Sequence, residues 1–191
     1  MRPDEAVPIG AALLAAGLKI LEVPLNSPEP FVSIARLAQA LGARALVGAG
    51  TVLTEGDVAP LAAAGGRLCL MPHGDTAIIR AAKRQGLVCL PGVATPSEAF
   101  AALAAGADGL KLFPAEALPP AVVRAWRAVL PAGTRLYPVG GITPGTMAPY
   151  VAAGATGFGL GSALYKPGMT PSQVGVTAAA FVAAWRALAP C

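Results

Sequence analysis

The stretch "LAAGADGLKLFP" (Leu103–Pro114) recurs with changes at three other places in the chain. The related segments are "LLAAGLKILEVPL" (13–25), "LAAAGGRLCLMP" (61–72) and "VAAGATGFGLGS" (151–162). Each combines the end of an alanine-rich helix, a glycine that can cap the helix in a left-handed conformation, and a short apolar run. A continuously apolar run is typical of a parallel strand covered on both faces. The repeat therefore indicates strands that alternate with helices.

Other apolar runs lie between these segments and complete the pattern. We expect strands over Lys19–Leu25, Ala45–Gly50, Leu68–Pro72, Leu87–Gly92, Gly109–Pro114, Leu136–Gly141 and Thr156–Ser162. We expect helices over Pro3–Ala16, Ser97–Ala105 and Pro120–Val129. Strands and helices that alternate in this way define an α/β fold. The repetition favours a (β/α)8 TIM barrel in one domain, residues 1–191. A doubly wound sheet is the weaker alternative, because neither "GAGTVL" nor "GFGLGS" has the dinucleotide-binding spacing.

The count of expected strands is seven, whereas a complete barrel has eight. The sequence opens on the helix at Pro3–Ala16, and no strand precedes it. We therefore expect the first strand to be missing from this chain. The native protein would begin about 15–20 residues upstream, and Met1 would be an internal residue.

Composition narrows the class of protein. The chain is 55% hydrophobic and 13% charged, so a disordered protein is excluded. No apolar run is long enough to cross a bilayer, and the N-terminus is a poor secretory signal. Basic residues are scattered and aromatic residues make up 5%, which argues against nucleic acid. The formal net charge of +4 suits a small anionic ligand, and we expect a cytoplasmic protein without a membrane partner.

The cysteines and the single histidine give no sign of a metal site. Cys69, Cys89 and Cys191 are an odd number without a CxxC motif. We interpret them as reduced, and Cys69 and Cys89 as small buried apolar residues within strands. His73 stands in an expected loop without neighbouring ligands, so we predict no bound metal.

Two charged residues stand within expected strands, where burial is costly. One reading of Lys111 is a lysine at a strand end that reaches solvent, or half of a buried ion pair. The other is an amine nucleophile, because desolvation lowers a lysine pKa and the neutral amine can attack a ketone. Glu22 would then move protons for the Schiff-base steps, or it would simply be the counter-ion of Lys111.

Two glycine-rich strand ends suit a phosphate group. "VGGITPGT" and "LGSALY" would follow the last two barrel strands, where backbone N–H groups commonly hold phosphate. The alternative is that both are tight strand-to-helix turns with no ligand.

Six motifs, in order and spacing, resemble a known family over nearly the whole chain. They are "LEVPLNSP" (21–28), "VGAGTVL" (47–53), "LPGVATPSEAF" (90–100), "LKLFPAE" (110–116), "VGGITP" (139–144) and "GLGSALY" (159–165). On these motifs the chain resembles the class I aldolases of the 2-keto-3-deoxy-6-phosphogluconate type. The resemblance implies an eight-stranded barrel, usually a homotrimer, without metal or cofactor. It implies cleavage of a phosphorylated 2-keto-3-deoxy sugar acid to pyruvate and glyceraldehyde 3-phosphate.

The resemblance also assigns roles by motif position. Lys111 would be the Schiff-base lysine and Glu22 the general acid and base. Substrate would be bound by Gly50, Thr51, Asn26, Pro91, Phe113 and Val139, and phosphate by Gly140, Gly141, Gly161 and Ser162. An arginine that the family carries near the end of its first strand would be absent with that strand.

Two positions point to one branch of this family. Gluconate-type members carry "EVTLRT" and "PTGG", whereas this chain has "EVPLNSP" and "PVGG". Asn26 thus replaces an arginine and Val139 a threonine, as in the 2-dehydro-3-deoxy-6-phosphogalactonate branch. The two substrates differ at C4, and one hydroxyl contact is worth about 1–3 kcal/mol, so we expect both to be cleaved.

Other functions remain open from sequence. They are a related aldolase acting on 4-hydroxy-2-oxoglutarate, a phosphate-binding barrel isomerase or synthase without covalent chemistry, and a non-catalytic barrel that binds sugar phosphates. Retention of both Glu22 and Lys111 argues against the last of these.

Overall fold

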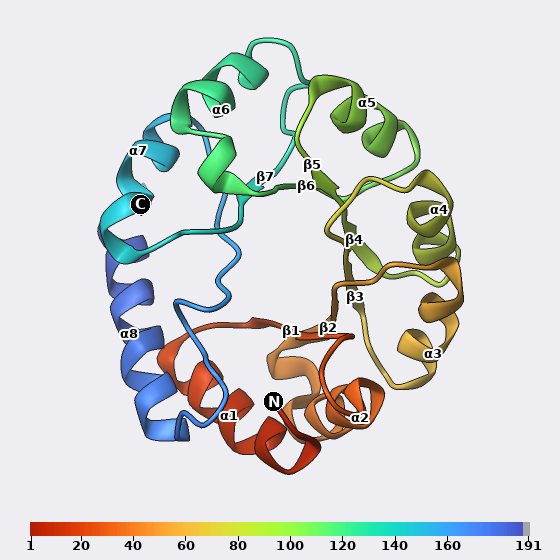
Figure 1. Cartoon of the computed structure of the whole chain (residues 1–191), viewed down its shortest axis with the longest axis vertical. Coiled ribbons are helices and arrows are strands. Elements are labelled where there is room, and N and C mark those ends of the chain that lie inside the picture. Colours follow the sequence, from red (N-terminus) through yellow and green to blue (C-terminus); the bar gives the residue numbers. More distant parts are fainter. Residues whose placement is uncertain (189–191) are drawn as a thin grey trace.

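In the computed structural model, which describes residues 1–188, seven short parallel strands surround a central space and helices lie outside them (Figure 1). One sheet has the order β1-β2-β3-β4, and the other has the order β5-β6-β7. The strands are β1 (Ile20–Pro24), β2 (Leu46–Gly50), β3 (Leu68–Leu70), β4 (Val88–Leu90), β5 (Gly92–Val93), β6 (Leu110–Leu112) and β7 (Leu136–Pro138). All neighbours pair in parallel, as the alternation of strands and helices predicts.

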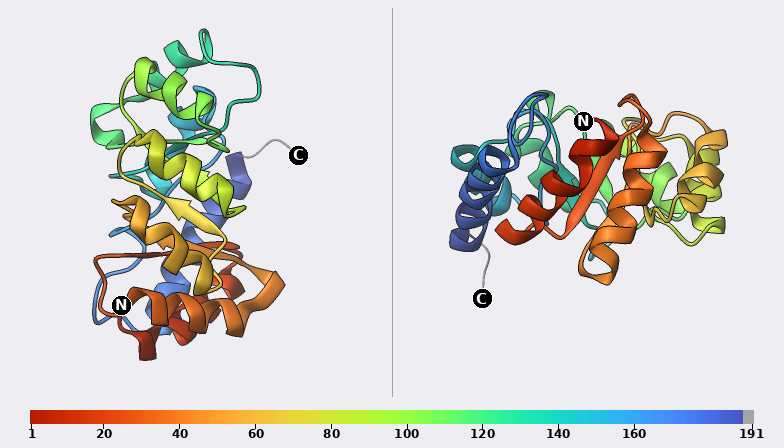
Figure 2. Two further views of the ribbon diagram at one scale, coloured as in Figure 1. Left: turned by 90° about the vertical axis from the view of Figure 1, so that its right-hand side faces the viewer. Right: turned by 90° about the horizontal axis from the view of Figure 1, so that it is seen from below.

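The helices form the outer layer of this ring. They are α1 (Pro3–Ala16), α2 (Pro30–Leu41), α3 (Val58–Ala63), α4 (Thr76–Arg84), α5 (Pro96–Ala104), α6 (Pro120–Arg127), α7 (Met147–Ala152) and α8 (Pro171–Leu188). Helix α1 packs against both α2 and α8. Figure 2 shows the ring from the side and from below, with helices covering its outer surface. None of these helices is long and apolar enough to cross a membrane.

The glycines of the repeated segments end helices as the sequence predicts. All four have positive φ angles, which are 107° at Gly17, 78° at Gly65, 101° at Gly106 and 102° at Gly154. A residue with a Cβ is strained in this left-handed conformation, whereas glycine adopts it readily. The repeat is therefore a structural unit of helix, glycine cap and strand.

Several strands are shorter than predicted, and one expected strand is absent from residues 1–188. The expected strand Leu87–Gly92 divides into β4 and β5, because Pro91 has no N–H to donate to a neighbouring strand. The segment Thr156–Ser162 makes only one bridge, between Val139 and Gly159. Glycines at 157, 159 and 161 lower its strand propensity, since glycine loses more entropy on ordering.

The ring is not closed by backbone pairing within the described chain. β1 pairs only with β2, and the segment that contains Gly159 pairs only beside β7. Figure 1 shows this segment apart from β1. Ile20 at the start of β1 has 60% of its surface exposed. Within residues 1–188 the structure thus agrees with the α/β fold of parallel strands that the sequence predicts, and no backbone pairing that closes the barrel is detected.

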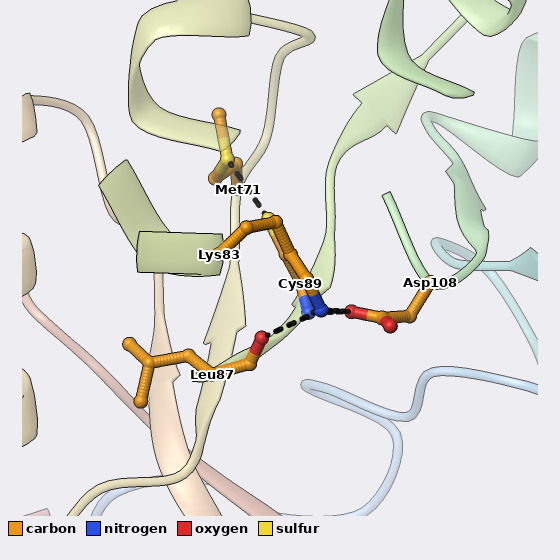
Figure 3. A network of polar contacts seen from close by, with 5 residues as sticks. All are labelled: Met71, Lys83, Leu87, Cys89 and Asp108. Atoms are coloured by element: carbon orange, nitrogen blue, oxygen red, sulfur yellow. Dashed lines mark hydrogen bonds and ion pairs between the residues drawn. The ribbon is translucent and has the colours of Figure 1, made fainter. Parts of the chain in front are cut away.

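A polar network ties α4 to the start of β4 (Figure 3). The Nζ of Lys83 donates to Asp108 Oδ2 at 2.6 Å and to the carbonyl of Leu87 at 3.1 Å. The same Asp108 oxygen accepts from the backbone N–H of Cys89 at 2.8 Å. The network therefore satisfies two backbone groups at the entry to β4.

The buried sulfur atoms lie between the strands and the helix layer. Cys69 and Cys89 are in register on β3 and β4, and both are buried free thiols. The Cys89 thiol lies 3.9 Å from the sulfur of Met71. A hydrogen bond with Cys69, together with burial, raises the pKa of the Cys89 thiol and keeps it neutral. The interpretation of both as small buried residues is confirmed, whereas Cys191 lies outside the described residues.

Candidate active site

Glu22 and Lys111 point into the ring from two different sheets. Glu22 alternates along β1 with the buried residues Leu21 and Val23. Lys111 alternates along β6 with Leu110 and Leu112, which are 0% and 1% exposed. Because successive side chains of a strand point to opposite faces, the charged residues face away from the apolar layer under the helices.

The Lys111 amine has apolar surroundings and no acidic hydrogen-bond partner within residues 1–188. Its Nζ lies 4.5 Å from the centre of the Phe113 ring. Its backbone N–H donates to the carbonyl of Pro91 at 2.9 Å. Burial lowers the pKa of Lys111, and the charge of Glu22 opposes this shift. A lowered pKa raises the fraction of neutral, nucleophilic amine near neutral pH.

The Glu22 carboxylate lies over the end of the neighbouring strand. A side chain at Gly50 would collide with both carboxylate oxygens, so glycine makes room for them. Solvent reaches Glu22 on the face of β1 opposite Leu21 and Val23, while many protein atoms crowd around its carboxylate. Burial raises the pKa of Glu22, and the charge of Lys111 partly offsets the rise. The two groups therefore influence each other without a direct ion pair in the described chain.

The residues that follow β1 and β2 lie at the same end of the sheet. Leu25 N–H donates to the carbonyl of Gly50 at 2.9 Å, which ties the two strand ends together. Thr51, half-buried, has a φ of 54°, and left-handed backbone is unusual for a residue with a branched side chain. Asn26 is exposed in the next turn and makes no side-chain hydrogen bond within residues 1–188.

The glycine-rich segments meet through one backbone bridge. Val139 pairs with Gly159, and Gly159 N–H donates to the carbonyl of Pro138 at 3.1 Å. Gly140 and Gly141 have φ angles of 109° and 61°, a succession that glycine alone adopts readily. Beyond the bridge, Gly161 and Ser162 are exposed, and no atom lies within 4 Å of where a Cβ on Gly161 would stand.

The structure adds an acidic residue that sequence reasoning missed. Glu116 follows β6 in the short 3-10 helix Ala115–Ala117. Its carboxylate fills the space beside Gly140, and its Oε1 lies 3.1 Å from where a Cβ on Gly141 would stand. The motif "LKLFPAE" contains Glu116, but nothing in the sequence links it to glycines 24 and 25 residues later.

Metal ligands do not gather in this region. No group of three or more His, Cys, Asp or Glu side chains that could hold a metal ion occurs among residues 1–188.

Comparisons with known proteins give consistent results. A family model described as "Aldolase: KDPG and KHG aldolase" matches residues 1–174. A Rhizobium meliloti (strain 1021) protein named "Probable 2-dehydro-3-deoxy-6-phosphogalactonate aldolase" is 48% identical over 188 residues, 98% of this chain and 89% of that protein. The Escherichia coli (strain K12) "2-dehydro-3-deoxy-6-phosphogalactonate aldolase" is 44% identical over 184 residues, 96% of this chain and 90% of that protein. A solved structure described as "Native KDPGal structure" has a TM-score of 0.96 at 43% identity, covering 98% of this chain and 93% of that one.

Proposed function

Because this chain belongs to the KDPG and KHG aldolase family, we propose that it is a Schiff-base aldolase that cleaves 2-dehydro-3-deoxy-6-phosphogalactonate to pyruvate and glyceraldehyde 3-phosphate. The names of its relatives support this substrate. The observation that carries the proposal is the pair Glu22 and Lys111, which face the ring interior with pKa values displaced toward their neutral forms.

In the proposed mechanism, the neutral amine of Lys111 attacks the C2 ketone of the substrate. Protonated Glu22 donates its proton to the carbinolamine oxygen, which leaves as water, and a protonated imine (iminium) to Lys111 remains. The Glu22 carboxylate then removes the C4 hydroxyl proton. The C3–C4 bond breaks and glyceraldehyde 3-phosphate leaves, while the electron pair of the broken bond moves toward the iminium and forms an enamine on Lys111. Protonation at C3 and hydrolysis of the imine release pyruvate and restore the free amine.

The remaining predicted residues are proposed to hold the two ends of the substrate. Gly50 and Thr51 would bind the carboxylate end, with Pro91 and Phe113 as apolar walls near Lys111. Gly140, Gly141, Gly161 and Ser162 would bind phosphate. The exposure of Gly141, Gly161 and Ser162 and the positive φ angles of Gly140 and Gly141 support a backbone site for an anion.

Val139 is proposed to set the choice between C4 epimers, and Asn26 to lie nearby. The Val139 side chain packs against Gly159 and presents no hydroxyl to the substrate. Val139→Thr should therefore shift the ratio of kcat/KM for the galactonate and gluconate epimers toward gluconate by up to about tenfold. Steady-state kinetics with both epimers test this. An unchanged ratio of kcat/KM would show that Val139 does not discriminate between the two configurations at C4.

The covalent mechanism is tested by borohydride reduction in the presence of pyruvate. We expect one reduced adduct, on Lys111, identified by peptide mass spectrometry. The matched control is Lys83→Met, which changes a lysine outside the ring and should retain the adduct. An adduct on another lysine, or none, would contradict the mechanism.

The second candidate is cleavage of 4-hydroxy-2-oxoglutarate by the same lysine. The description of the matching family includes KHG aldolase, and the acidic Glu116 beside the phosphate-type glycines favours testing an unphosphorylated substrate. We further propose that residues 1–191 act as one domain in a cytoplasmic homotrimer. Analytical ultracentrifugation tests the oligomeric state.

A further inference from the structure

The Glu116 carboxylate has no partner that explains its place in the fold. The side chain is exposed and makes no hydrogen bond or ion pair within residues 1–188. It nevertheless lies against Gly140 and Gly141. A structural turn does not need a charge at this place. An apolar side chain could fill the same space beside the two left-handed glycines.

The backbone around Glu116 fixes its approach to the glycines. Ala115 N–H donates to the carbonyl of Val139 at 2.9 Å, directly before the glycine pair. The Tyr150 hydroxyl donates to the carbonyls of Ala115 at 2.9 Å and Leu118 at 3.3 Å. These bonds hold the chain on both sides of Glu116. The backbone of Glu116 is therefore fixed next to the glycine pair, and its carboxylate lies beside Gly140.

The charge of Glu116 acts on this neighbourhood. Burial raises the pKa of the Tyr150 phenol, and the carboxylate of Glu116 adds to the rise. An anion bound by the N–H groups of Gly140 and Gly141 would lie in the same field. The Glu116 carboxylate would repel this anion, because both are negatively charged. Salt would screen the repulsion, because the site is exposed.

We infer that Glu116 is a specificity-determining residue that weakens phosphate binding at Gly140 and Gly141. This inference rests on the proposed function, since it assigns phosphate to these glycines. By opposing a dianion, Glu116 reduces the advantage of a phosphorylated over an unphosphorylated keto acid. It also limits how tightly a phosphorylated aldehyde product is held.

The first test uses inorganic phosphate and two variants that change net charge equally. Glu116→Gln removes the charge beside the glycines and keeps a side chain of the same shape. Glu29→Gln removes a charge from an exposed residue before α2, at the same end of the barrel. We expect E116Q to bind phosphate about three- to tenfold more tightly at low ionic strength by calorimetry. The gain should shrink at high ionic strength, and E29Q should match the unmodified chain.

The second test compares phosphorylated and unphosphorylated 2-keto-3-deoxy acids of the same configuration. E116Q should lower KM for the phosphorylated compound and raise its kcat/KM about three- to tenfold. The kcat/KM for the unphosphorylated compound should stay within twofold. A merely structural role predicts the opposite, because a disturbed glycine loop would weaken phosphate binding.

These outcomes separate the inference from the proposed function. Unchanged or weaker phosphate binding by E116Q would overturn the role of Glu116. Borohydride trapping with pyruvate depends on Lys111 and should be equal in E116Q and the unmodified chain. Loss of trapping in the unmodified chain would overturn the aldolase proposal, while the phosphate measurements would still report on Glu116.

Discussion

Among residues 1–188, Lys83 and Lys111 both interact with a carboxylate, but their surroundings differ. Lys83 and Asp108 are in contact at 2.6 Å, and both also bond backbone groups at the start of β4. Lys111 and Glu22 face each other from different sheets without an ion pair, and burial displaces both pKa values toward the neutral form. The amine of Lys83 is engaged by two hydrogen bonds that stabilise the fold, whereas the amine of Lys111 has no acidic partner within residues 1–188.

The largest expected effect separates the two lysines by reactivity. Lys111→Met should reduce aldol cleavage at least about 1000-fold, because no other amine replaces the nucleophile. Lys83→Met should leave kcat within about twofold when corrected for folded protein. A coupled assay for pyruvate measures both variants. Comparable losses of activity in the two variants would contradict the proposed difference between Lys111 and Lys83.

The next effect concerns the carboxylate of the reactive pair. Glu22→Gln should lower kcat about 100- to 1000-fold, because an amide cannot move the protons of imine formation and C–C cleavage. Borohydride trapping should become slower but persist, since Lys111 is unchanged. Stopped-time trapping with pyruvate follows the rate. Full activity of this variant would reduce Glu22 to a counter-ion.

A smaller effect is expected at the structural pair, on stability rather than on rate. Asp108→Asn removes the charge that Lys83 contacts, and an amide placed with its NH2 toward Cys89 N–H would leave that donor unpaired. Both side chains are about one-third exposed, 34% and 33%, so solvent screening limits the loss to about 1 kcal/mol. Urea unfolding measures the free energy, and pyruvate formation per folded molecule should not change.

The smallest effect is the pH dependence of stability. The folded state binds a proton on Glu22 more tightly than the unfolded state, because its pKa is raised. This contribution is present below the unfolded pKa of about 4.3 and is lost as pH rises through the folded value. As pH rises from about 4 to the raised pKa, the unfolding free energy of the unmodified chain should therefore fall relative to that of E22Q. A gap that narrows with rising pH would contradict the direction of the shift.

Sequence reasoning predicted the repeated unit because one physical requirement acts at each copy. A helix that ends before a buried strand needs a left-handed residue, and glycine marks it at Gly17, Gly65, Gly106 and Gly154. Lys111 and Glu22 were found because charge within apolar strands is costly. Their orientation toward one ring interior follows from strand alternation, whereas their mutual effect on pKa depends on where the fold places β1 and β6.

The features that the sequence does not predict depend on partners far away in sequence. The division at Pro91 and the single bridge of Gly159 reflect hydrogen bonding to neighbouring strands, which local propensity does not describe. Local sequence does not indicate Glu116, because its contact with Gly140 arises only when β6 and β7 lie side by side.

Pro91 affects the backbone hydrogen bonding that joins the two sheets of the ring. Asp108 N–H and Lys111 N–H donate to the carbonyls of Cys89 and Pro91, at 3.0 and 2.9 Å. Pro91 itself returns no donor, so this seam lacks one backbone hydrogen bond that any other residue could supply. Glu22 stands on one side of the seam and Lys111 on the other. The seam that lacks this donor therefore lies between the two sheets that carry Glu22 and Lys111.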